Sequence, residues 1–312
     1  MKYSPILLFV YNRLSLTRKT IEALQKNFLA NCTDLYIFSD GPRKNDIEKV
    51  VQVRTYLQTI KGFKRIKVYE SKINKGLAAS IVEGVTKIIA IEGQVIVLED
   101  DLLTSPDFLT FMNQALDFYK EEYKVFSVSG FTMPIQGLES KNIYFTQRAS
   151  SWGWATWKDR WNVIDWEVRD YENFKNSPKQ RRAFNKMGSD LSNMLKKQMQ
   201  GEINSWAIRW CYHQFKHGLY SVYPTTSKIQ NIGLSDLNAT HTNEKFNRFK
   251  TILQTNKSDS FIFSNNIVLD TKVIKQFVKP YSLLIRIKYK LLNKIFSGFS
   301  LNLVFFIIAQ IR

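Results

Sequence analysis

Short apolar runs alternate with helix-like stretches through the first third of the chain, and this alternation constrains the fold most. The runs from Pro5 to Tyr11 and from Gln94 to Leu98 are continuously apolar, as in strands buried on both faces of a parallel sheet. The other predicted elements are a helix from Ser15 to Phe28, a strand from Asp34 to Ser39, a helix from Glu48 to Ile60, a strand from Ile66 to Tyr69, a helix from Leu77 to Ile91 and a strand from Val125 to Gly130. We therefore predict the α/β class with a Rossmann-like, doubly wound mixed sheet.

Polar residues follow the predicted strands, where ligands bind in open α/β sheets. Asn12 and Arg13 follow the first strand, and Asp40 follows the second. Lys75, in an Asn-Lys-Gly sequence before the third helix, could meet a phosphate together with nearby backbone N–H groups, or this stretch could be an ordinary loop-to-helix junction. Asp40 and Arg13 could equally cap turns, because SDGP is a strong turn sequence. The chain has no GxGxxG or GxxxxGKS motif, so dinucleotide and P-loop interpretations lack support.

Three consecutive acids, Glu99, Asp100 and Asp101, come directly after the apolar run VIVL. Adjacent carboxylates repel one another, and a divalent cation such as Mn²⁺ or Mg²⁺ offsets that cost through oxygen ligation. A solvated loop followed by a helix cap in Ser105-Pro106-Asp107 is the alternative. The position after a buried strand favours the metal interpretation, with the cation neutralising a nucleotide diphosphate.

The second half of the chain is less regular. The section from Ser150 to Trp166 is dense in tryptophan, and we expect it to form an irregular wall over the sheet. Two helices are predicted after it, from Pro178 to Gln200 and from Ile203 to Gly218. Both cysteines, Cys32 and Cys211, are expected to be reduced and buried.

The net charge of +18 is concentrated toward the C-terminus, where residues 271–312 carry eight Lys or Arg and no acid. Nucleic-acid binding is the usual first interpretation of such a charge, but this tail lacks interleaved base-stacking aromatics. Residues 280–296 instead have the pattern of an amphipathic helix that lies on an anionic membrane surface. A helix packed on the domain would also be amphipathic. The sequence shows no signal peptide and no apolar stretch of about 20 residues, so we expect a cytoplasmic protein, peripheral on the inner face of the cell membrane.

The segment VIVLEDDLLTSPDFLTFM resembles the metal-binding segment of the N-acetylglucosaminyltransferase I family, which are inverting glycosyltransferases with the A-type nucleotide-sugar fold, and of related bacterial sugar transferases. The likeness covers about residues 4–242. It continues in order through VYNR, FSDGP, VFSVSGF, SSWGWATW, SWAIRW, YPTTSKIQNIG and ATH.

The resemblance implies roles for several residues. Asp101 would be the direct protein ligand of the metal, while Glu99 and Asp100 would hold sugar and ribose hydroxyls. Arg13 and Asp40 would contact the nucleotide base and ribose. His241 matches a histidine that closes the site over the donor phosphates, and we group it with the metal site.

The catalytic base departs from the family pattern. The animal enzymes have an aspartate after the tryptophan of the matching helix, whereas here Trp206 is followed by Ala207. An inverting transfer needs a carboxylate that takes the proton of the acceptor hydroxyl. Glu202 is the nearest acid in the sequence, with Asp236 and Asp159 in reserve. Glu202 could instead be an acid that interacts with a helix dipole.

Three tryptophans, Trp152, Trp154 and Trp206, are candidates for acceptor binding because indole rings pack on pyranose faces. Core packing explains any one of them equally well. We expect residues 1–265 to be the catalytic domain, divided into a nucleotide-sugar half (1–130) and an acceptor half (131–265), and residues 270–312 to be a helical basic tail.

We therefore expect a metal-dependent, inverting transfer of a sugar from a nucleoside-diphosphate sugar, with UDP as the expected nucleotide. The acceptor would be a glycan or a lipid-linked molecule in bacterial surface polysaccharide synthesis, with no nucleic-acid partner. A nucleotidyltransferase of similar fold and a basic nucleic-acid-binding protein are the alternatives.

Overall fold

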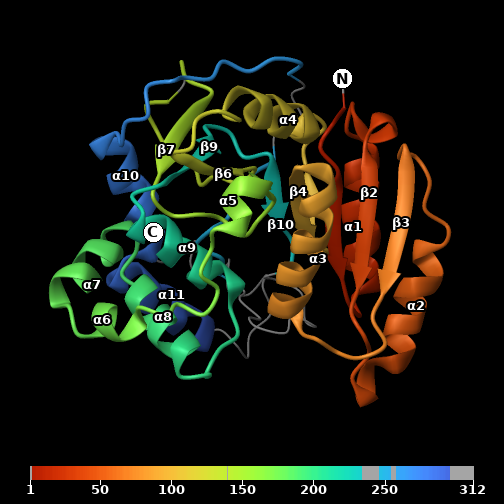
Figure 1. The fold of residues 1–312 in the computed structure, drawn as a ribbon, viewed down its shortest axis with the longest axis horizontal. Helices are drawn as coiled ribbons and strands as arrows, with labels where there is room; N and C mark the ends of the chain where they lie inside the picture. Colours follow the sequence, from red (N-terminus) through yellow and green to blue (C-terminus); the bar gives the residue numbers. More distant parts are fainter. Residues whose placement is uncertain (1, 139, 234–245, 254–257, 296–312) are drawn as a thin grey trace.

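A computed structural model describes residues 2–138, 140–233, 246–253 and 258–295 (Figure 1). Within these ranges the main sheet has eight strands. They are β1 (Ile6–Val10), β2 (Asp34–Ser39), β3 (Arg65–Glu70), β4 (Gln94–Glu99), β6 (Val125–Ser129), β7 (Ile143–Thr146), β8 (Trp154–Trp157) and β9 (Tyr220–Pro224). Two further short strands, β5 (Leu102–Thr104) and β10 (Ile229–Asn231), pair with each other.

The strand order β3-β2-β1-β4-β8-β6-β9-β7 confirms the predicted doubly wound mixed sheet. Strands β3, β2, β1 and β4 are parallel neighbours. Strand β8 is antiparallel to both β4 and β6, so β6 and its parallel neighbour β9 point the same way as β4. Only β7 and β8 run in the opposite direction. The chain passes from β1 to β2 and β3 on one side and then returns to β4 on the other side of β1, which puts the switch point of the sheet between β1 and β4.

Helices cover both faces of the sheet, which explains the continuous apolar runs of the strands (Figure 1). One face packs on α1 (Leu14–Gln25), α2 (Ile47–Leu57) and α4 (Phe108–Phe118). The other packs on α3 (Leu77–Glu92), α5 (Lys158–Asn162) and α9 (Trp206–Lys216). In β1, Ile6 and Leu8 face the first layer, whereas Leu7 and Phe9 face the second.

Strand β8 corrects the expected irregular wall in the tryptophan-rich section. Trp154 to Trp157 form a central strand of the sheet between β4 and β6. Their side chains alternate between the two cores, with Trp154 on the α3 side and Trp157 on the α4 side. Four residues are too short to show a strand pattern, and pairing with two neighbouring strands decides the conformation.

The region after β8 forms a helical cluster that differs from the two long helices predicted. It consists of α6 (Tyr171–Lys175), α7 (Pro178–Phe184) and α8 (Leu191–Met199), followed by α9. The predicted helix from Pro178 to Gln200 is interrupted at Gly188, which has φ +147°. A Cβ there would lie 2.1 Å from Nη1 of Arg148, so the chain passes close to that side chain only because the residue is glycine.

Of the two cysteines, Cys211 is buried as expected, but Cys32 is exposed. Cys32 ends a short 3₁₀ turn, Ala30–Cys32, that leads into β2. The turn points Ala30 inward and Cys32 outward, which corrects the prediction for Cys32.

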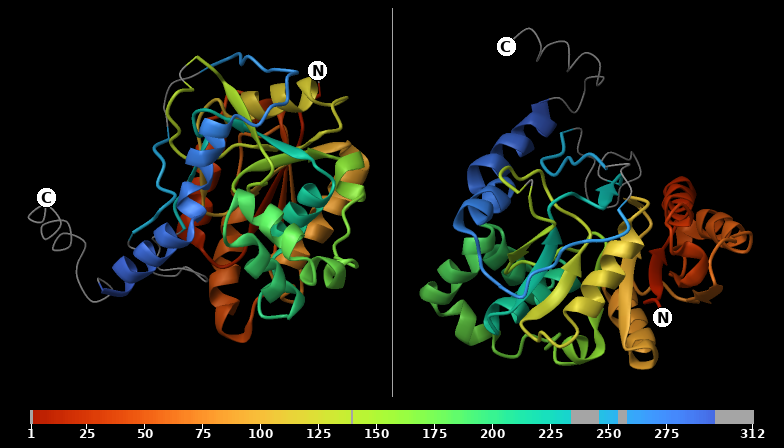
Figure 2. Two further views of the ribbon diagram at one scale, coloured as in Figure 1. Left: turned by 90° about the vertical axis from the view of Figure 1, so that its left-hand side faces the viewer. Right: turned by 90° about the horizontal axis from the view of Figure 1, so that it is seen from above.

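The predicted tail begins as part of the folded body. Helix α10 (Thr271–Val278) inserts Phe277, which is fully buried, against the rings of Tyr144 and Tyr223. Helix α11 (Leu283–Ile295) follows and runs along the outside of the molecule (Figure 2). No helix in the described ranges is both long and apolar enough to span a bilayer.

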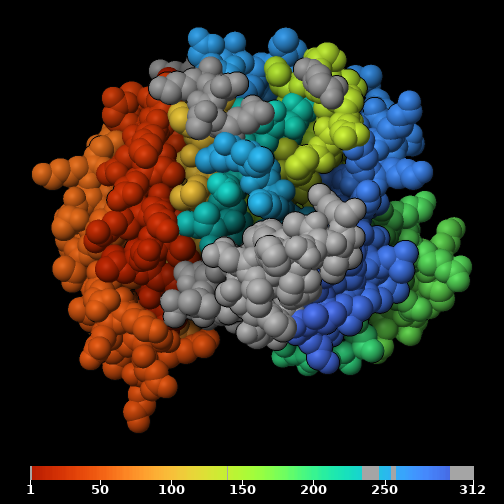
Figure 3. Space-filling model, turned by 180° about the vertical axis from the view of Figure 1, so that it is seen from behind, coloured from red at the N-terminus to blue at the C-terminus, as the bar shows by residue number. Residues whose placement is uncertain are grey.

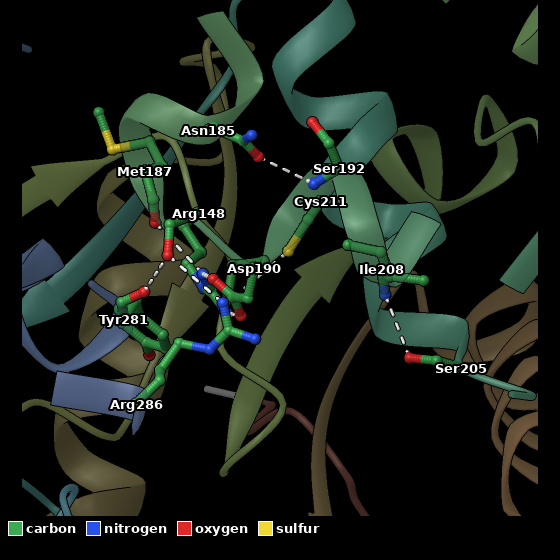
Figure 4. Close-up of polar contacts among 12 residues, drawn as sticks. Arg148, Asn185, Met187, Asp190, Ser192, Ser205, Ile208, Cys211, Tyr281 and Arg286 are labelled. Atoms are coloured by element: carbon green, nitrogen blue, oxygen red, sulfur yellow. Dashed lines mark hydrogen bonds and ion pairs between the residues drawn. The ribbon is translucent and has the colours of Figure 1, made fainter. Parts of the chain in front are cut away.

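Arg148 and Tyr281 join these C-terminal helices to the helical cluster (Figure 4). Arg148 forms two parallel hydrogen bonds of 2.9 Å with the carboxylate of Asp190. Its guanidinium carbon lies 3.6 Å from the ring centroid of Tyr281. Ser189 Oγ donates to the carbonyl oxygen of Tyr281 at 2.8 Å and accepts from Arg286 at 3.3 Å. These contacts fix the start of α11 to the segment that precedes α8.

Candidate active site

The carboxyl ends of β1, β2 and β4 meet at one edge of the sheet and bring together the polar residues that follow them. Val10 is opposite Ser39 in the parallel register, and Phe9 is opposite Glu99. The residues after these positions are therefore neighbours at the same edge. This is the arrangement that the sequence predicts for Arg13, Asp40 and the acids that begin at Glu99.

Asp100 and Asp101 are buried and share a single arginine as ion-pair partner, whereas Glu99 is partly buried. Asp100 is 3% exposed and Asp101 is 8% exposed. Nη2 of Arg13 contacts Oδ1 of Asp100 and lies 3.0 Å from Oδ2 of Asp101. The backbone of this loop is also fixed, because Thr20 Oγ1 donates to the Asp100 carbonyl and the Ile232 amide donates to the Asp101 carbonyl, each at 2.9 Å. The solvated-loop alternative is therefore wrong.

Burial makes ionisation of these acids costly. It raises the pKa of Glu99 to about 8, and the charges of Asp101 and Asp100 add to the shift. Burial also raises the pKa of Asp100 to about 6, although the guanidinium of Arg13 opposes this. Arg13 loses solvation as well, but the two aspartates outweigh that loss and raise the pKa of its guanidinium. Even with Glu99 protonated at neutral pH, one arginine cannot neutralise both Asp100 and Asp101, so this edge of the sheet favours an additional cation.

The local geometry fits a hard divalent cation. Oδ2 of Asp100 is buried and has no hydrogen-bond partner within the described part of the chain. In that same part of the chain, no three His, Cys, Asp or Glu side chains form a complete metal cage. Mg²⁺ is commonly held by only one or two carboxylates, with substrate phosphates and water completing the coordination. Asp100 and Asp101 suit that partial ligand set. Asp236 and His241 lie outside the described residues.

Gly233 brings a second chain segment against Asp101. A Cβ at this glycine would lie 2.1 Å from Oδ2 of Asp101, so any side chain would displace the carboxylate. The segment is held there by β10, which pairs antiparallel with β5 directly after the acids. The close approach shields Asp101 from solvent and restricts the directions from which a ligand can reach it.

Asp40 organises the neighbouring loop through its side chain. Oδ1 accepts from the backbone amides of Gly41 at 2.8 Å and Lys75 at 2.9 Å, and Oδ2 accepts from Gly76 at 2.9 Å. Asn74 closes the loop by donating to the Gly41 carbonyl at 2.8 Å. The carboxylate therefore joins the loop after β2 to the N-terminus of α3. A base or ribose contact by Asp40 would have to be made beside these three amides.

Asn12 and Lys75 also have partners within the protein. Asn12 Nδ2 donates to Oδ1 of Asp46 at 2.8 Å, and Tyr11 donates to the other carboxylate oxygen at 2.9 Å. The hydrogen bond from Asn12, followed by that from Tyr11, lowers the pKa of Asp46. The Lys75 ammonium forms an ion pair with Glu83 on α3. These contacts shape the wall of the site on the β2 and β3 side.

The candidate bases differ in position. Glu202 lies in the loop between α8 and α9, exposed, with its carboxylate 3.8 Å from Nζ of Lys197. Asp159 follows β8, whose end at Trp157 is opposite Gln94, the first residue of β4. It is therefore separated from the acid edge by the length of β4, roughly 17 Å at the usual rise per residue. Asp159 lies at the wrong edge of the sheet to act as the base.

Two of the three candidate acceptor tryptophans belong to the core. Trp154 is 1% exposed, and its ring centroid lies 4.9 Å from that of Trp206. Neither ring has a free face for a sugar. Trp152 is partly buried, with its ring 4.6 Å from Phe131 and 5.7 Å from Phe249. A separate hollow of about 760 Å³ lies among α6, α7 and α8, and its lining includes none of the predicted site residues.

Sequence reasoning missed a buried ion pair beside the acids. Lys228 Nζ lies 2.6 Å from Oδ2 of Asp107, and Ser105 Oγ donates to the other oxygen at 2.5 Å. The Ser105 amide donates to the Lys228 carbonyl at 2.9 Å. Asp107 belongs to the SPDF sequence, which was a helix cap in the alternative interpretation of the acid loop, and Lys228 lies in the YPTTSKIQNIG segment. The two motif segments therefore meet in space and brace β5 and β10.

No protein-family model and no curated protein matches this chain. Solved structures share part of its fold. A mannosyltransferase from Pyrobaculum calidifontis, solved with GDP-Man and Mn²⁺, is 15% identical with a TM-score of 0.36 over 50% of this chain and 46% of its own. S. aureus TarS is 16% identical with a TM-score of 0.30 over 45% of this chain and 22% of its own.

A UDP-glucose pyrophosphorylase solved with UDP-glucose is 12% identical with a TM-score of 0.35. That match covers 72% of this chain and 91% of the pyrophosphorylase. The chain thus spans less than half of the mannosyltransferase and about a fifth of TarS. These are low similarities of fold, and the interpretation of the site depends on its own residues.

Proposed function

We propose that this chain is a metal-dependent, inverting glycosyltransferase of the A-type fold that uses a nucleoside-diphosphate sugar, with UDP as the nucleotide. The observation that carries the proposal is the buried pair Asp100 and Asp101, placed by β4 at the carboxyl edge of a doubly wound sheet. Ligands of such sheets bind at this edge. The ordered motif series that resembles the N-acetylglucosaminyltransferase I family supports the same activity.

Different residues of the chain would bind the cation and the nucleotide sugar. Asp101 and Asp100 would hold a divalent cation, which when bound neutralises charge on the leaving diphosphate. Lys75 lies in the loop fixed by Asp40 and would have to leave its ion pair with Glu83 to reach a donor phosphate. Glu99, at the end of β4, would accept a hydrogen bond from a sugar or ribose hydroxyl. His241 would approach the phosphates from the segment after Gly233.

Glu202 is our proposed general base. It would accept the proton of the acceptor hydroxyl as that oxygen attacks the anomeric carbon opposite the leaving diphosphate. Its exposure suits an acceptor that arrives from solvent, a glycan or lipid-linked hydroxyl. Asp236 is the remaining reserve. Trp152 is the remaining candidate for contact with the acceptor sugar.

A nucleotidyltransferase would share the sheet and the acids, so the products decide between the two reactions. The experiment is a screen of nucleotide sugars with Mn²⁺ that measures both free nucleoside diphosphate and pyrophosphate. Release of nucleoside diphosphate supports glycosyl transfer. Formation of a nucleotide sugar from a sugar phosphate and nucleoside triphosphate, with pyrophosphate as the second product, would support the alternative and contradict the proposal. Binding of nucleic acid without either reaction would favour the third interpretation.

We also propose that α11 attaches the enzyme to an anionic membrane surface, and the orientation of this helix supports the proposal. Its inward face is partly polar: Arg286 donates to Ser189, and Asn293 exchanges two hydrogen bonds with the backbone of Phe246 at 2.9 and 3.1 Å. Its outward face is apolar and includes Leu284, which is 81% exposed. The other exposed apolar residues of this face are Leu283, Ile287, Leu291 and Ile295.

An ordinary packed helix turns its apolar residues to the core. The inward side of α11 carries Ile285, Tyr289 and Leu292 beside Arg286 and Asn293, but five further apolar residues face outward. Lys288, Lys290 and Lys294 accompany the outward apolar residues. An apolar strip with flanking lysines suits the headgroup boundary of anionic lipid. Figure 3 shows α11 on the surface of the molecule.

A further inference from the structure

Arg13 contacts one carboxylate oxygen of each of the two aspartates that would hold a metal ion, and Oδ2 of Asp100 has no partner within the described residues. A single nitrogen, Nη2, contacts Oδ1 of Asp100 and lies 3.0 Å from Oδ2 of Asp101. The two aspartates are the polar partners of the Arg13 side chain within the described residues. The guanidinium therefore occupies the position of a point cation between the two acids.

A guanidinium and a divalent cation cannot share this position without a large repulsion. Metal–oxygen distances for Mg²⁺ are about 2.1 Å. A metal bound to Oδ2 of Asp101 would therefore lie within about 5 Å of Nη2 if Arg13 stayed where it is. Like charges at that separation, partly shielded from water, strongly disfavour each other. Entry of the metal thus requires the Arg13 side chain to leave.

The position of Arg13 allows its side chain to move away from the aspartates. It is the residue before α1, at the end of the loop after β1, and its side chain retains 16% exposure, against 5% for Asp100. Its backbone is fixed because the Arg13 carbonyl accepts from the Thr17 amide at 2.9 Å. The side chain can therefore rotate while the backbone stays in place. The first turn of α1 contains no acid that would recapture it.

We infer that Arg13 is an internal counter-cation that holds Asp100 and Asp101 in the free protein and is exchanged for the metal when the nucleotide diphosphate arrives. The inference rests on the proposed function. The diphosphate accepts the displaced guanidinium, so metal and nucleotide bind together and metal alone binds weakly. Arg13 would then regulate the order of binding at this site and protect the acids from adventitious cations.

The test measures Mn²⁺ binding by electron paramagnetic resonance and calorimetry, with no turnover involved. Wild type and Arg13→Gln are each titrated with Mn²⁺ alone and with Mn²⁺ plus UDP. Arg13→Gln should bind Mn²⁺ alone about tenfold or more tightly than wild type, because the competing charge is gone. The factor by which UDP strengthens Mn²⁺ binding should be smaller in the variant by a similar ratio.

A matched control separates direct competition between Arg13 and the metal from a general effect of removing one positive charge. Arg43 also lies at the β2 side of this edge but contacts Asn74 and not the acids, so Arg43→Gln should change Mn²⁺ affinity less than about threefold. Arg13→Met keeps the apolar stem and replaces the Gln variant if that variant loses its cooperative thermal transition.

Two outcomes would contradict the inference about Arg13, and they can be told apart. If wild type and the Arg13 variants bind Mn²⁺ alone equally well, Arg13 does not compete, and the inference is overturned while the metal site stands. If no form binds Mn²⁺ even with UDP, the proposed metal-dependent function fails and the inference fails with it.

Discussion

Lys228 and Asp107 form an ion pair of 2.6 Å in which both side chains are almost completely buried. The pair joins the SPDF segment after the acids to the strand that leads to Gly233. Because a buried charge without its partner is costly, Lys228→Met should lower the free energy of unfolding by about 3 kcal/mol or more. Urea denaturation measures this.

The control for that prediction is Lys120→Met, which breaks an exposed pair with Asp117 at 3.4 Å. It should cost less than about 1 kcal/mol. Combining Lys228→Met with Asp107→Leu should recover part of the loss, since no isolated charge remains. Equal effects of the two lysine variants would show that the Lys228 pair does not support the fold.

The sequence predicted the nucleotide half of the fold well because its central strands β1 and β4 are buried on both faces. Continuous apolar runs such as β1 and β4 can be recognised as buried strands from their own sequence, without knowing which strands lie beside them. Strand β8 could not be predicted in this way. Its four residues become a strand because β4 and β6 pair with them, which is information that lies elsewhere in the chain.

The sequence predicted which residues of the candidate site lie at the same edge of the sheet, but not which of them contact one another. Strand ends located Arg13, Asp40 and Asp101 at one edge. The sequence could not show that Arg13 pairs with the acids, or that three backbone amides occupy the Asp40 carboxylate. Such contacts depend on how loops from different strands approach one another.

Glu202→Gln should lower turnover by roughly 10²–10⁴ and leave UDP binding unchanged, because loss of a general base affects the transition state. Stability should change little, since the Glu202–Lys197 pair is exposed. Single-turnover kinetics together with calorimetry separate these quantities. Glu172→Gln, which removes another exposed acid paired with a lysine, is the control. Activity within a few-fold of wild type would exclude Glu202 and direct the search to Asp236.

His213 should make the fold sensitive to acid. It is buried and stacks on Phe126 with ring centroids 5.3 Å apart. Burial, followed by the neighbouring His217 and Lys216, lowers the pKa of His213 to about 4. The unfolded chain binds this proton near pH 6.5, so stability is full above that pH and falls as the pH decreases toward 4.

Replacement of the ring tests this assignment. Between pH 6.5 and pH 4 the free energy of unfolding should fall by about 3 kcal/mol, as measured by denaturant unfolding across the pH range. His213→Phe should flatten the slope between pH 6.5 and pH 4, whereas His217→Gln should retain most of it because His217 is exposed. An unchanged slope in His213→Phe would assign the acid sensitivity to other groups.

The outward face of α11 should attach the full chain to anionic vesicles. Several buried aliphatic side chains and flanking lysines contribute together, so salt should release the protein only in part. Leu284→Asp combined with Leu291→Asp should abolish sedimentation with vesicles. Ile262→Asp, at an exposed apolar residue that lies away from α11 and donates its amide to Asn142, should not. Equal sedimentation of all three proteins would contradict the assignment.

Truncation separates the attachment helix from the folded body. A chain that ends after Ser282 keeps α10 and Tyr281, and it should remain folded while losing vesicle binding. A chain that ends after Asp270 loses the fully buried Phe277 and should be destabilised by at least about 3 kcal/mol. Thermal unfolding of the two truncated chains measures the difference. Equal stability would mean that α10 contributes nothing to the core.

The measurement that tests the central claim most directly is a calorimetric titration of UDP with and without Mn²⁺ in wild type and Asp101→Asn. Wild type should bind UDP only weakly without the cation, and Asp101→Asn should lose about tenfold or more of the Mn²⁺-dependent affinity. Asp117→Asn, an exposed aspartate on α4, is the control, and thermal unfolding confirms that each variant is folded. Unchanged affinity of folded Asp101→Asn for UDP with Mn²⁺ would contradict a metal–diphosphate site at this edge of the sheet.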